Sequence, residues 1–198
     1  MAVKPERRPA ALLYAELRNF TRLSEVLQPD KVLELANEFF TFAAKNVIAG
    51  AGNVLSVQND SLLASFVEGE PRRFNDDALK TAQAIQRDFA PIGERWRTDY
   101  GLAAAVALGL HTGEAVFGMA GPLGAQQFVA FGDCVSVAER IVHRARAGEI
   151  VISLDVMKAL GAKVQTLGAE ELPPLELGNR RPPLPIYGMV LETRLDFT

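Results

Sequence analysis

Apolar residues return along the chain at helical spacing in four stretches. Between residues 29 and 47, and again between 74 and 96, apolar side chains recur every three or four positions, which is typical of helices that bury one face. A third such stretch covers residues 135–145 and is followed by Gly148. A short helix is expected from Ser153, whose hydroxyl suits a helix N-cap, to Gly161. These stretches predict four helices.

Shorter apolar runs between the helices predict strands. Asn59-Asp60 separates two of these runs and indicates a hairpin, and Gly121-Pro122 indicates a turn between two others. The expected order of elements is βαββαβββαβαββ, which favours an α+β fold with a largely antiparallel sheet flanked by helices. Eight of these strands have defined ranges, which are 11–17, 54–57, 62–66, 102–110, 114–119, 126–131, 150–152 and 186–191.

Composition narrows the class of protein. The chain has 198 residues, of which 48% are apolar and 23% charged, and these values are typical of a globular domain. We expect one domain over residues 10–191, a flexible tail over 1–9 and a second tail over 192–198. A net charge of −3 gives no general attraction to nucleic acid. One cysteine and no long apolar stretch favour a cytoplasmic protein that does not insert into a membrane.

Three segments carry a resemblance to a known family. The first is Tyr14-Ala-Glu-Leu-Arg-Asn-Phe-Thr, the second is Val57-Gln-Asn-Asp-Ser-Leu-Leu-Ala-Ser-Phe, and the third is Gly109-Leu-His-Thr-Gly-Glu followed by Phe131-Gly-Asp-Cys-Val-Ser-Val-Ala-Glu-Arg. Together they resemble the class III nucleotidyl cyclase catalytic domain in order and spacing over residues 10–191. The resemblance implies a ferredoxin-like cyclase fold.

The resemblance also implies a reaction. Members of this family convert ATP or GTP into the 3′,5′-cyclic nucleotide and pyrophosphate. Two Mg²⁺ or Mn²⁺ ions lie between two carboxylates, because such ions prefer hard oxygen ligands. The active site lies at a dimer interface, so the resemblance implies either a homodimer or a heterodimer with a second cyclase chain.

The two metal carboxylates of the family match Glu16 and Asp60. Glu16 replaces an aspartate, and its extra methylene displaces the oxygen atoms that octahedral Mg²⁺ would require. The phosphate-binding turn of the family matches Asn19, Phe20 and Thr21, with Asn19 in place of a glycine.

The remaining site positions concern the base, the ribose and the transition state. Ser56 stands where the family has a purine-selecting lysine, and Val129 where it has an aspartate or threonine. Ser136 matches the ribose-orienting asparagine and Arg140 the arginine that stabilises transition-state charge. A basic residue near the end of the domain contacts phosphate in the family, and Arg180 or Arg181 could stand there.

Each candidate also has a purely structural interpretation. Glu16 and Asp60 could be ordinary strand-end and turn residues, and Ser136 and Arg140 could be surface residues of a helix. Three hypotheses follow: a working cyclase with an unusual site, a silent cyclase-homology domain that binds nucleotide, dimerises or regulates, and another phosphoryl enzyme on the same scaffold. The replacements at the site favour weak or lost cyclase activity.

A second set of residues is expected to be structural. His111 lies in a predicted strand, and His143 lies in an arginine-rich run typical of a solvated helix face. Asp133 is expected to cap the helix that follows it, and Cys134 to pack as a small apolar side chain.

Overall fold

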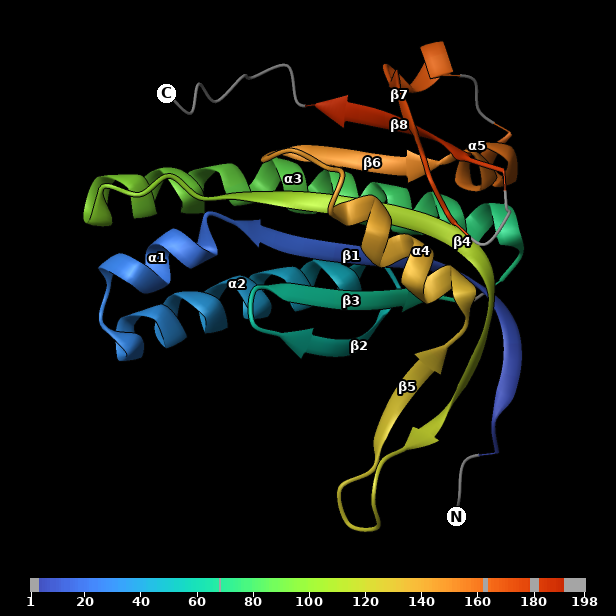
Figure 1. Ribbon diagram of the computed structural model, residues 1–198, viewed down its shortest axis with the longest axis horizontal. Coiled ribbons are helices and arrows are strands. Elements are labelled where there is room, and N and C mark those ends of the chain that lie inside the picture. The colour runs from blue at the N-terminus through green and yellow to red at the C-terminus, as the bar shows by residue number, and fades with distance from the viewer. Residues whose placement is uncertain (1–3, 68, 162–163, 179–181, 191–198) are drawn as a thin grey trace.

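The computed structural model describes residues 4–67, 69–161, 164–178 and 182–190. These residues form an eight-stranded sheet with helices on both faces (Figure 1). The strands are β1 (Glu6–Arg18), β2 (Asn53–Gln58), β3 (Ser61–Phe66), β4 (Ala105–Ala120), β5 (Gln127–Phe131), β6 (Glu149–Ser153), β7 (Glu170–Leu175) and β8 (Leu184–Val190). The helices are α1 (Phe20–Val26), α2 (Pro29–Ala49), α3 (Pro71–Tyr100), α4 (Asp133–Val142) and α5 (Leu154–Leu160), with a 3₁₀ turn at Val164–Leu167.

The sheet has the strand order β2-β3-β1-β4-β6-β8-β7, and β5 pairs with the far half of β4. Only β4 and β6 run parallel, while every other neighbouring pair is antiparallel. The expected α+β fold with a largely antiparallel sheet is therefore confirmed. The hairpin of β4 and β5 projects away from the rest of the sheet (Figure 1).

The predicted separation of residues 102–110 from 114–119 is wrong. One strand, β4, runs through both segments without a break. The residues between the two expected strands pair with β1, with His111 opposite Leu12 and Glu114 opposite Pro9. Ladder hydrogen bonds to the neighbouring strand thus override the local loss of apolar character.

The expected N-terminal tail over residues 1–9 also needs correction. Strand β1 begins at Glu6, and Glu6 lies opposite Phe117 of β4. Pro9 lacks a backbone N–H, yet it is accommodated because residues 6–10 of β1 pair with β4 alone. The C-terminal tail proposed for residues 192–198, in contrast, lies outside the described residues.

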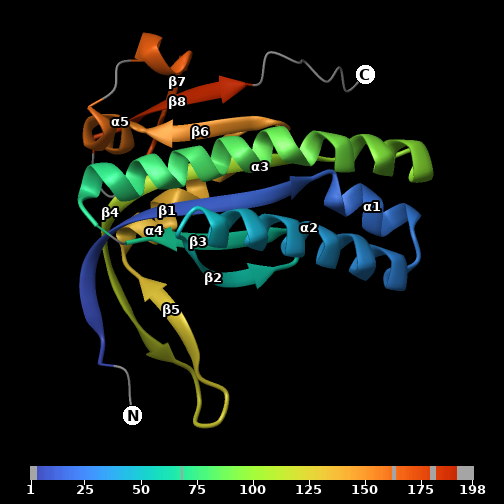
Figure 2. The ribbon, with the colours of Figure 1, turned by 180° about the vertical axis from the view of Figure 1, so that it is seen from behind.

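The two faces of the sheet carry different helices. Odd-numbered residues of β1, such as Leu13 and Leu17, pack in the larger core beneath α2 and α3, which cover one face (Figure 2). Even-numbered residues, such as Leu12 and Tyr14, face α4 on the opposite side (Figure 1). This alternation follows from the pleat of the strand and puts Glu16 on the α4 face.

Helix α4 lies unusually close to β4, because two glycines leave room for it. A Cβ atom at Gly109 would come within 2.5 Å of the backbone nitrogen of Val142, and one at Gly113 within 2.8 Å of Cys134 Cβ. The glycines therefore fix the height of α4 above the sheet. This close approach places the C-terminal end of α4 near the end of β1.

Two elements were not expected from the sequence. Helix α1 has only seven residues and buries only Leu23 fully, so its apolar repeat is too short to stand out in the sequence. Strand β7 contains Pro173 and Pro174, which are tolerated because β7 is the edge strand of the sheet.

The hairpin at Asn59-Asp60 and the turn at Gly121-Pro122 are both present. Within the described residues, no helix combines the length and apolar character needed to cross a membrane.

Candidate functional site

Glu16 and Asp60 lie next to each other at one end of the β1–β3 pair. Glu16 lies directly opposite Ser61, and the backbone N–H of Leu17 donates a hydrogen bond of 2.8 Å to the carbonyl oxygen of Asp60. Asn59 adopts a φ of 49°, a left-handed conformation that asparagine tolerates in tight turns. The backbone therefore places the two residues matched to the metal carboxylates side by side.

The side chain of Glu16 is nearly buried and already has two partners. Its Oε1 accepts a hydrogen bond from Nη1 of Arg18, which lies two residues further along the same face of β1. Its Oε2 lies 3.5 Å from Nε2 of His143, at the end of α4. His143, which was expected only on a solvated face, thus reaches the candidate site from its 58% exposed position.

Arg18 is the contributor that the sequence interpretation missed. Besides Glu16, it donates hydrogen bonds of 2.7 Å each from Nη2 to the carbonyl oxygens of Val142 and Ala145. The sequence could have indicated this ion pair, because residues i and i+2 of a strand share a face and Glu16 and Arg18 carry opposite charges.

The two carboxylates differ in how well they suit a divalent cation. Asp60 is half-buried, and within the described ranges no hydrogen bond or ion pair occupies its carboxylate, so its oxygens suit a hard cation. Glu16 does not fit as it stands, because both of its oxygens face groups of the chain. The described part of the chain also holds no cluster of three or more His, Cys, Asp or Glu side chains able to enclose a metal ion.

The candidate phosphate-binding turn follows β1. Asn19 has a φ of 67°, the left-handed conformation for which glycine is favoured and asparagine is tolerated. Its side-chain Nδ2 donates a hydrogen bond of 2.8 Å to the carbonyl oxygen of Ala103, which anchors the turn to the segment before β4. Phe20 and Thr21 begin α1 directly after this turn.

The two candidate base-reading positions lie on neighbouring strands. Ser56 of β2 is half-buried and lies opposite Leu63, on the face of the sheet that α4 covers. Val129 of β5 is also half-buried and lies opposite Gly118. Strands β2 and β5 approach each other, so both positions belong to the same region. Only one of them, Ser56, has a polar side chain.

Ser136 and Arg140 are both exposed on α4, where a spacing of four places them on one face. Arg140 donates hydrogen bonds from Nη1 to the carbonyl oxygen of Leu177 at 3.1 Å, and from Nη2 to that of Glu176. In the described structure, neither residue forms a hydrogen bond or ion pair with Glu16 or Asp60. Arg180 and Arg181, the remaining candidates, lie outside the described residues.

The residues expected to be structural behave largely as such. His111 is buried, and its Nδ1 lies 2.8 Å from the Ser153 hydroxyl, which also accepts a hydrogen bond from the backbone N–H of Val156. Burial lowers the pKa of the His111 imidazole, although the carboxylates of Asp155 and Asp133 act in the opposite direction. The N-cap of α4 is Gly132 rather than Asp133, which occupies the first turn.

Burial also affects two other groups on the α4 face. Tyr14 has a pKa raised to about 12, first by burial and then by the carboxylate of Glu139. The thiol of Cys134 donates to the carbonyl oxygen of Glu114 at 3.0 Å, and burial raises its pKa. A buried, protonated thiol of this kind packs as a small apolar side chain, as its position in the sequence indicated.

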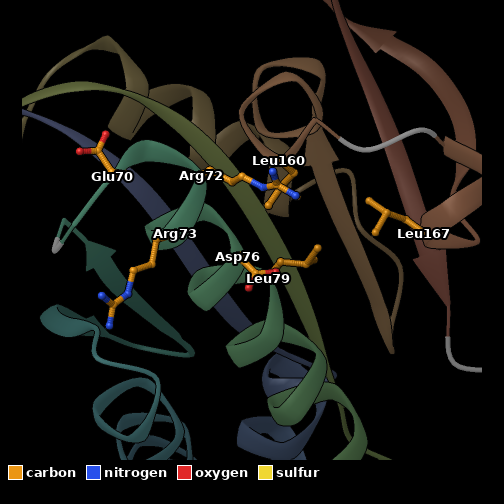
Figure 3. A pocket seen from close by; sticks show the side chains of 7 residues that line it. All are labelled: Glu70, Arg72, Arg73, Asp76, Leu79, Leu160 and Leu167. Atoms are coloured by element: carbon orange, nitrogen blue, oxygen red, sulfur yellow. The ribbon is translucent and has the colours of Figure 1, made fainter.

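A separate pocket of about 490 Å³ lies between the start of α3 and α5, remote from these residues (Figure 3). Leu79, Leu160 and Leu167 contribute apolar surface to it. Arg72 extends over Leu160, whereas Arg73 points away from it (Figure 3). The pocket belongs to the α3 side of the sheet and not to the face that carries Glu16.

The mixed sheet, the α4 packing and the paired carboxylate positions define a nucleotidyl cyclase fold. The family description "Adenylate and Guanylate cyclase catalytic domain" matches residues 3–178, most of the chain. The chain belongs to this family, the class III adenylate and guanylate cyclase catalytic domains.

Individual relatives agree with this assignment. Adenylate cyclase 1 of Rhizobium meliloti is 26% identical over 136 residues, which are 68% of this chain but 20% of that protein. The crystal structure of the guanylyl cyclase Cya2 has a TM-score of 0.80 at 26% identity, covering 95% of this chain and 93% of that one. The adenylyl cyclase CyaB from P. aeruginosa shares the fold, with a TM-score of 0.87 at 20% identity and coverage of 99% and 100%. The chain thus spans about a fifth of the length of the Rhizobium relative.

Proposed function

We propose that this domain binds ATP or GTP together with Mg²⁺ or Mn²⁺ at the interface of a dimer, and that it cyclises the nucleotide very slowly or not at all. Family membership supports the nucleotide as ligand, and the similar proteins include both adenylyl and guanylyl cyclases. The individual residues determine how much of the family reaction remains.

Two retained groups support binding of the triphosphate. Asp60 offers a carboxylate that no described group occupies, and Arg140 offers a permanent positive charge on the exposed face of α4. A divalent cation bound at this edge would neutralise phosphate charge. Arg140 would donate hydrogen bonds to phosphate oxygens after leaving the carbonyl groups of residues 176 and 177, to which it is now bonded.

The observation that carries the proposal of weak turnover is Val129. Its branched apolar side chain is half-buried on β5, where the resemblance places a hydrogen-bonding group for the purine edge. Ser56, on the neighbouring strand β2, is too short to reach the base as a lysine would. A site without these contacts holds the base loosely, and selectivity between purines then falls because no buried polar group penalises the wrong one.

Ser136 removes a second contact, the one that would orient the ribose of the nucleotide. Its hydroxyl is shorter than an asparagine amide and offers a single donor, so the ribose 3′-hydroxyl is poorly oriented. Loss of one positioned donor costs about 10²–10³-fold in rate. The site retains charge for binding phosphate but lacks the groups that align the reacting atoms.

Exposed apolar residues support a second copy of the chain as the partner. Within the described residues, β2 and the β4–β5 hairpin carry several large apolar side chains that are open to solvent, and these strands lie side by side. No hydrogen bond or ion pair joins Asp60 to Arg140 in the described part of the chain, which also favours a site completed by a partner. The exposed side chains, which we call the arm surface, are Val57, Met119, Leu123, Phe128 and Phe131.

The proposal is tested with purified protein at micromolar concentration. Binding of ATP and GTP is measured by calorimetry in the presence of Mn²⁺, and cyclic nucleotide is measured by chromatography. Binding with little or no product supports the proposal. Absence of any nucleotide binding, in the dimeric protein, would contradict it and favour a silent domain that acts only by dimerising.

A further inference from the structure

Arg18 connects three parts of the molecule beside Glu16 and Asp60, the two residues matched to the metal carboxylates. One amino group of its guanidinium donates to Glu16 on its own strand. The other donates to the carbonyl oxygens of Val142, the last residue of α4, and of Ala145, in the segment that follows α4, at 2.7 Å each. The side chains of Arg18 and Glu16 are only 23% and 12% exposed, so this ion pair is largely shielded from solvent.

The contacts of Arg18 hold it in place from two sides. The last carbonyl groups of a helix lack partners within the helix and form the negative end of its dipole, so they favour a cation. A guanidinium presents several N–H donors in a rigid plane and can satisfy these carbonyl groups and a carboxylate together. To leave Glu16, Arg18 must therefore also give up its hydrogen bonds to α4 or rotate about them.

Glu16 is equally constrained. Its second oxygen faces Nε2 of His143 at 3.5 Å, so the chain supplies a neighbour for each oxygen. A divalent cation that approached Glu16 would meet the positive charge of Arg18 at close range, and at short distance such repulsion is strong even near the surface. The oxygens of Asp60 carry no such obstacle among the described groups.

We propose that Arg18 serves as a built-in cation that occupies Glu16 in place of a metal ion. Glu16 is then a positioning residue that ties β1 to the end of α4, and divalent cations at this edge are held by Asp60 and by the phosphates of the nucleotide. This inference rests on the proposed function only in placing cation and nucleotide at this edge of the sheet.

The inference is tested by titrating Mn²⁺ alone into the full chain and measuring free Mn²⁺ by electron paramagnetic resonance. Arg18→Gln removes the competing charge and frees Glu16, so Mn²⁺ affinity should rise roughly tenfold, as expected for loss of one like charge at about 5 Å. The double variant Arg18→Gln with Glu16→Gln should return to the affinity of the parent. Arg144→Gln makes the same charge change at a nearby exposed position and should have little effect.

Glu16→Gln in the parent provides a second test that does not depend on the Arg18 variant folding. The amide can still accept a hydrogen bond from Arg18, and Mn²⁺ affinity should fall by less than in Asp60→Asn, because Glu16 contributes only a charge and is not a ligand. Asp60→Asn should weaken binding clearly. An equal loss in the Glu16 and Asp60 variants, or no gain in a folded Arg18→Gln protein, would overturn the inference.

The same variants separate this inference from the proposed function. Nucleotide binding is measured on the parent with Mn²⁺ and ATP. If the parent binds no nucleotide but Mn²⁺ affinity still rises in Arg18→Gln and falls back in the double variant, the proposed function fails and the role of Arg18 stands. If the parent binds nucleotide and the Arg18 variant shows no gain in Mn²⁺ affinity, the role of Arg18 fails alone.

Discussion

The backbone N–H of Leu17 donates a hydrogen bond of 2.8 Å to the carbonyl oxygen of Asp60. This bond fixes the β2–β3 turn against the end of β1 without using any side chain. The position of Asp60 beside Glu16 is therefore set by the backbone. Substitutions of the Asp60 side chain leave this bond intact, so their effects report on cation and nucleotide binding more than on folding.

Replacement of Asp60 by Asn should weaken binding of a Mn²⁺–nucleotide complex roughly tenfold, because one negative charge facing a divalent cation is lost. Thermal stability should change little, since the Asp60 carboxylate has no partner among the described residues. Calorimetry with a non-hydrolysable ATP analogue measures the binding. Asp99→Asn, an exposed substitution near the end of α3, is the matched control. Equal affinity for the parent and Asp60→Asn would show that Asp60 is not a ligand.

ATP and GTP should bind with affinities that differ by less than about fivefold, because Ser56 and Val129 provide little that distinguishes the two purine edges. Introducing Ser56→Lys together with Val129→Asp should favour ATP by restoring polar contacts to the base. Competition binding with both nucleotides measures the ratio. A strong preference in the parent would mean that other residues read the base.

The arm surface should mediate a symmetric homodimer, which would place the Ser136–Arg140 face of one chain opposite the Glu16–Asp60 edge of the other. Phe131 is 63% exposed, and Phe131→Glu should raise the dissociation constant roughly thirtyfold, or about 2 kcal/mol, as expected for loss of an aromatic anchor. Light scattering measures the mass. Val26→Glu, which is 60% exposed on α1, is the control and should leave the dimer intact. A strict monomer in the presence of nucleotide and metal would contradict this prediction.

The pH dependence of stability should reflect His111. Burial lowers its pKa in the folded state, so the unfolded chain binds a proton first as the pH falls below about 6.5. The free energy of unfolding should therefore decrease as the pH falls from about 6.5 through the folded-state pKa. His111→Gln can still accept a hydrogen bond from Ser153 but does not titrate, so it should reduce this slope. Chemical denaturation at several pH values measures it, and identical slopes for both proteins would count against the prediction.

The sequence predicted those features that depend on local pattern or on short motifs. Apolar periodicity located α2, α3 and α4, and the Asn59-Asp60 turn was evident from its residue types. The pairing of Glu16 with Asp60, in contrast, came from the family resemblance, because these residues lie far apart in the chain. The predictions of helices and of the turn succeeded because each depends on residues close together in the chain.

Features that depend on distant partners were missed. Nothing local shows that residues 111–114 continue a strand, because their ladder partners lie about a hundred residues earlier in β1. The role of Arg18 depends on Val142 and Ala145, which are 124 and 127 residues away. The sequence identified Glu16 as a candidate ligand, but only the packing of α4 against β4 shows that His143 faces its second oxygen.

The central claim concerns turnover, and it is tested most directly by measuring cyclic nucleotide formed from ATP and GTP with Mn²⁺. The parent is compared with the variant Glu16→Asp, Ser56→Lys, Val129→Asp, Ser136→Asn. We expect little or no product from the parent and a gain of about 10²-fold or more in ATP cyclisation by the variant, since the restored contacts to the base and the ribose position the reacting groups. Robust cyclisation by the parent, abolished by Asp60→Ala, would contradict the account and define an ordinary working cyclase.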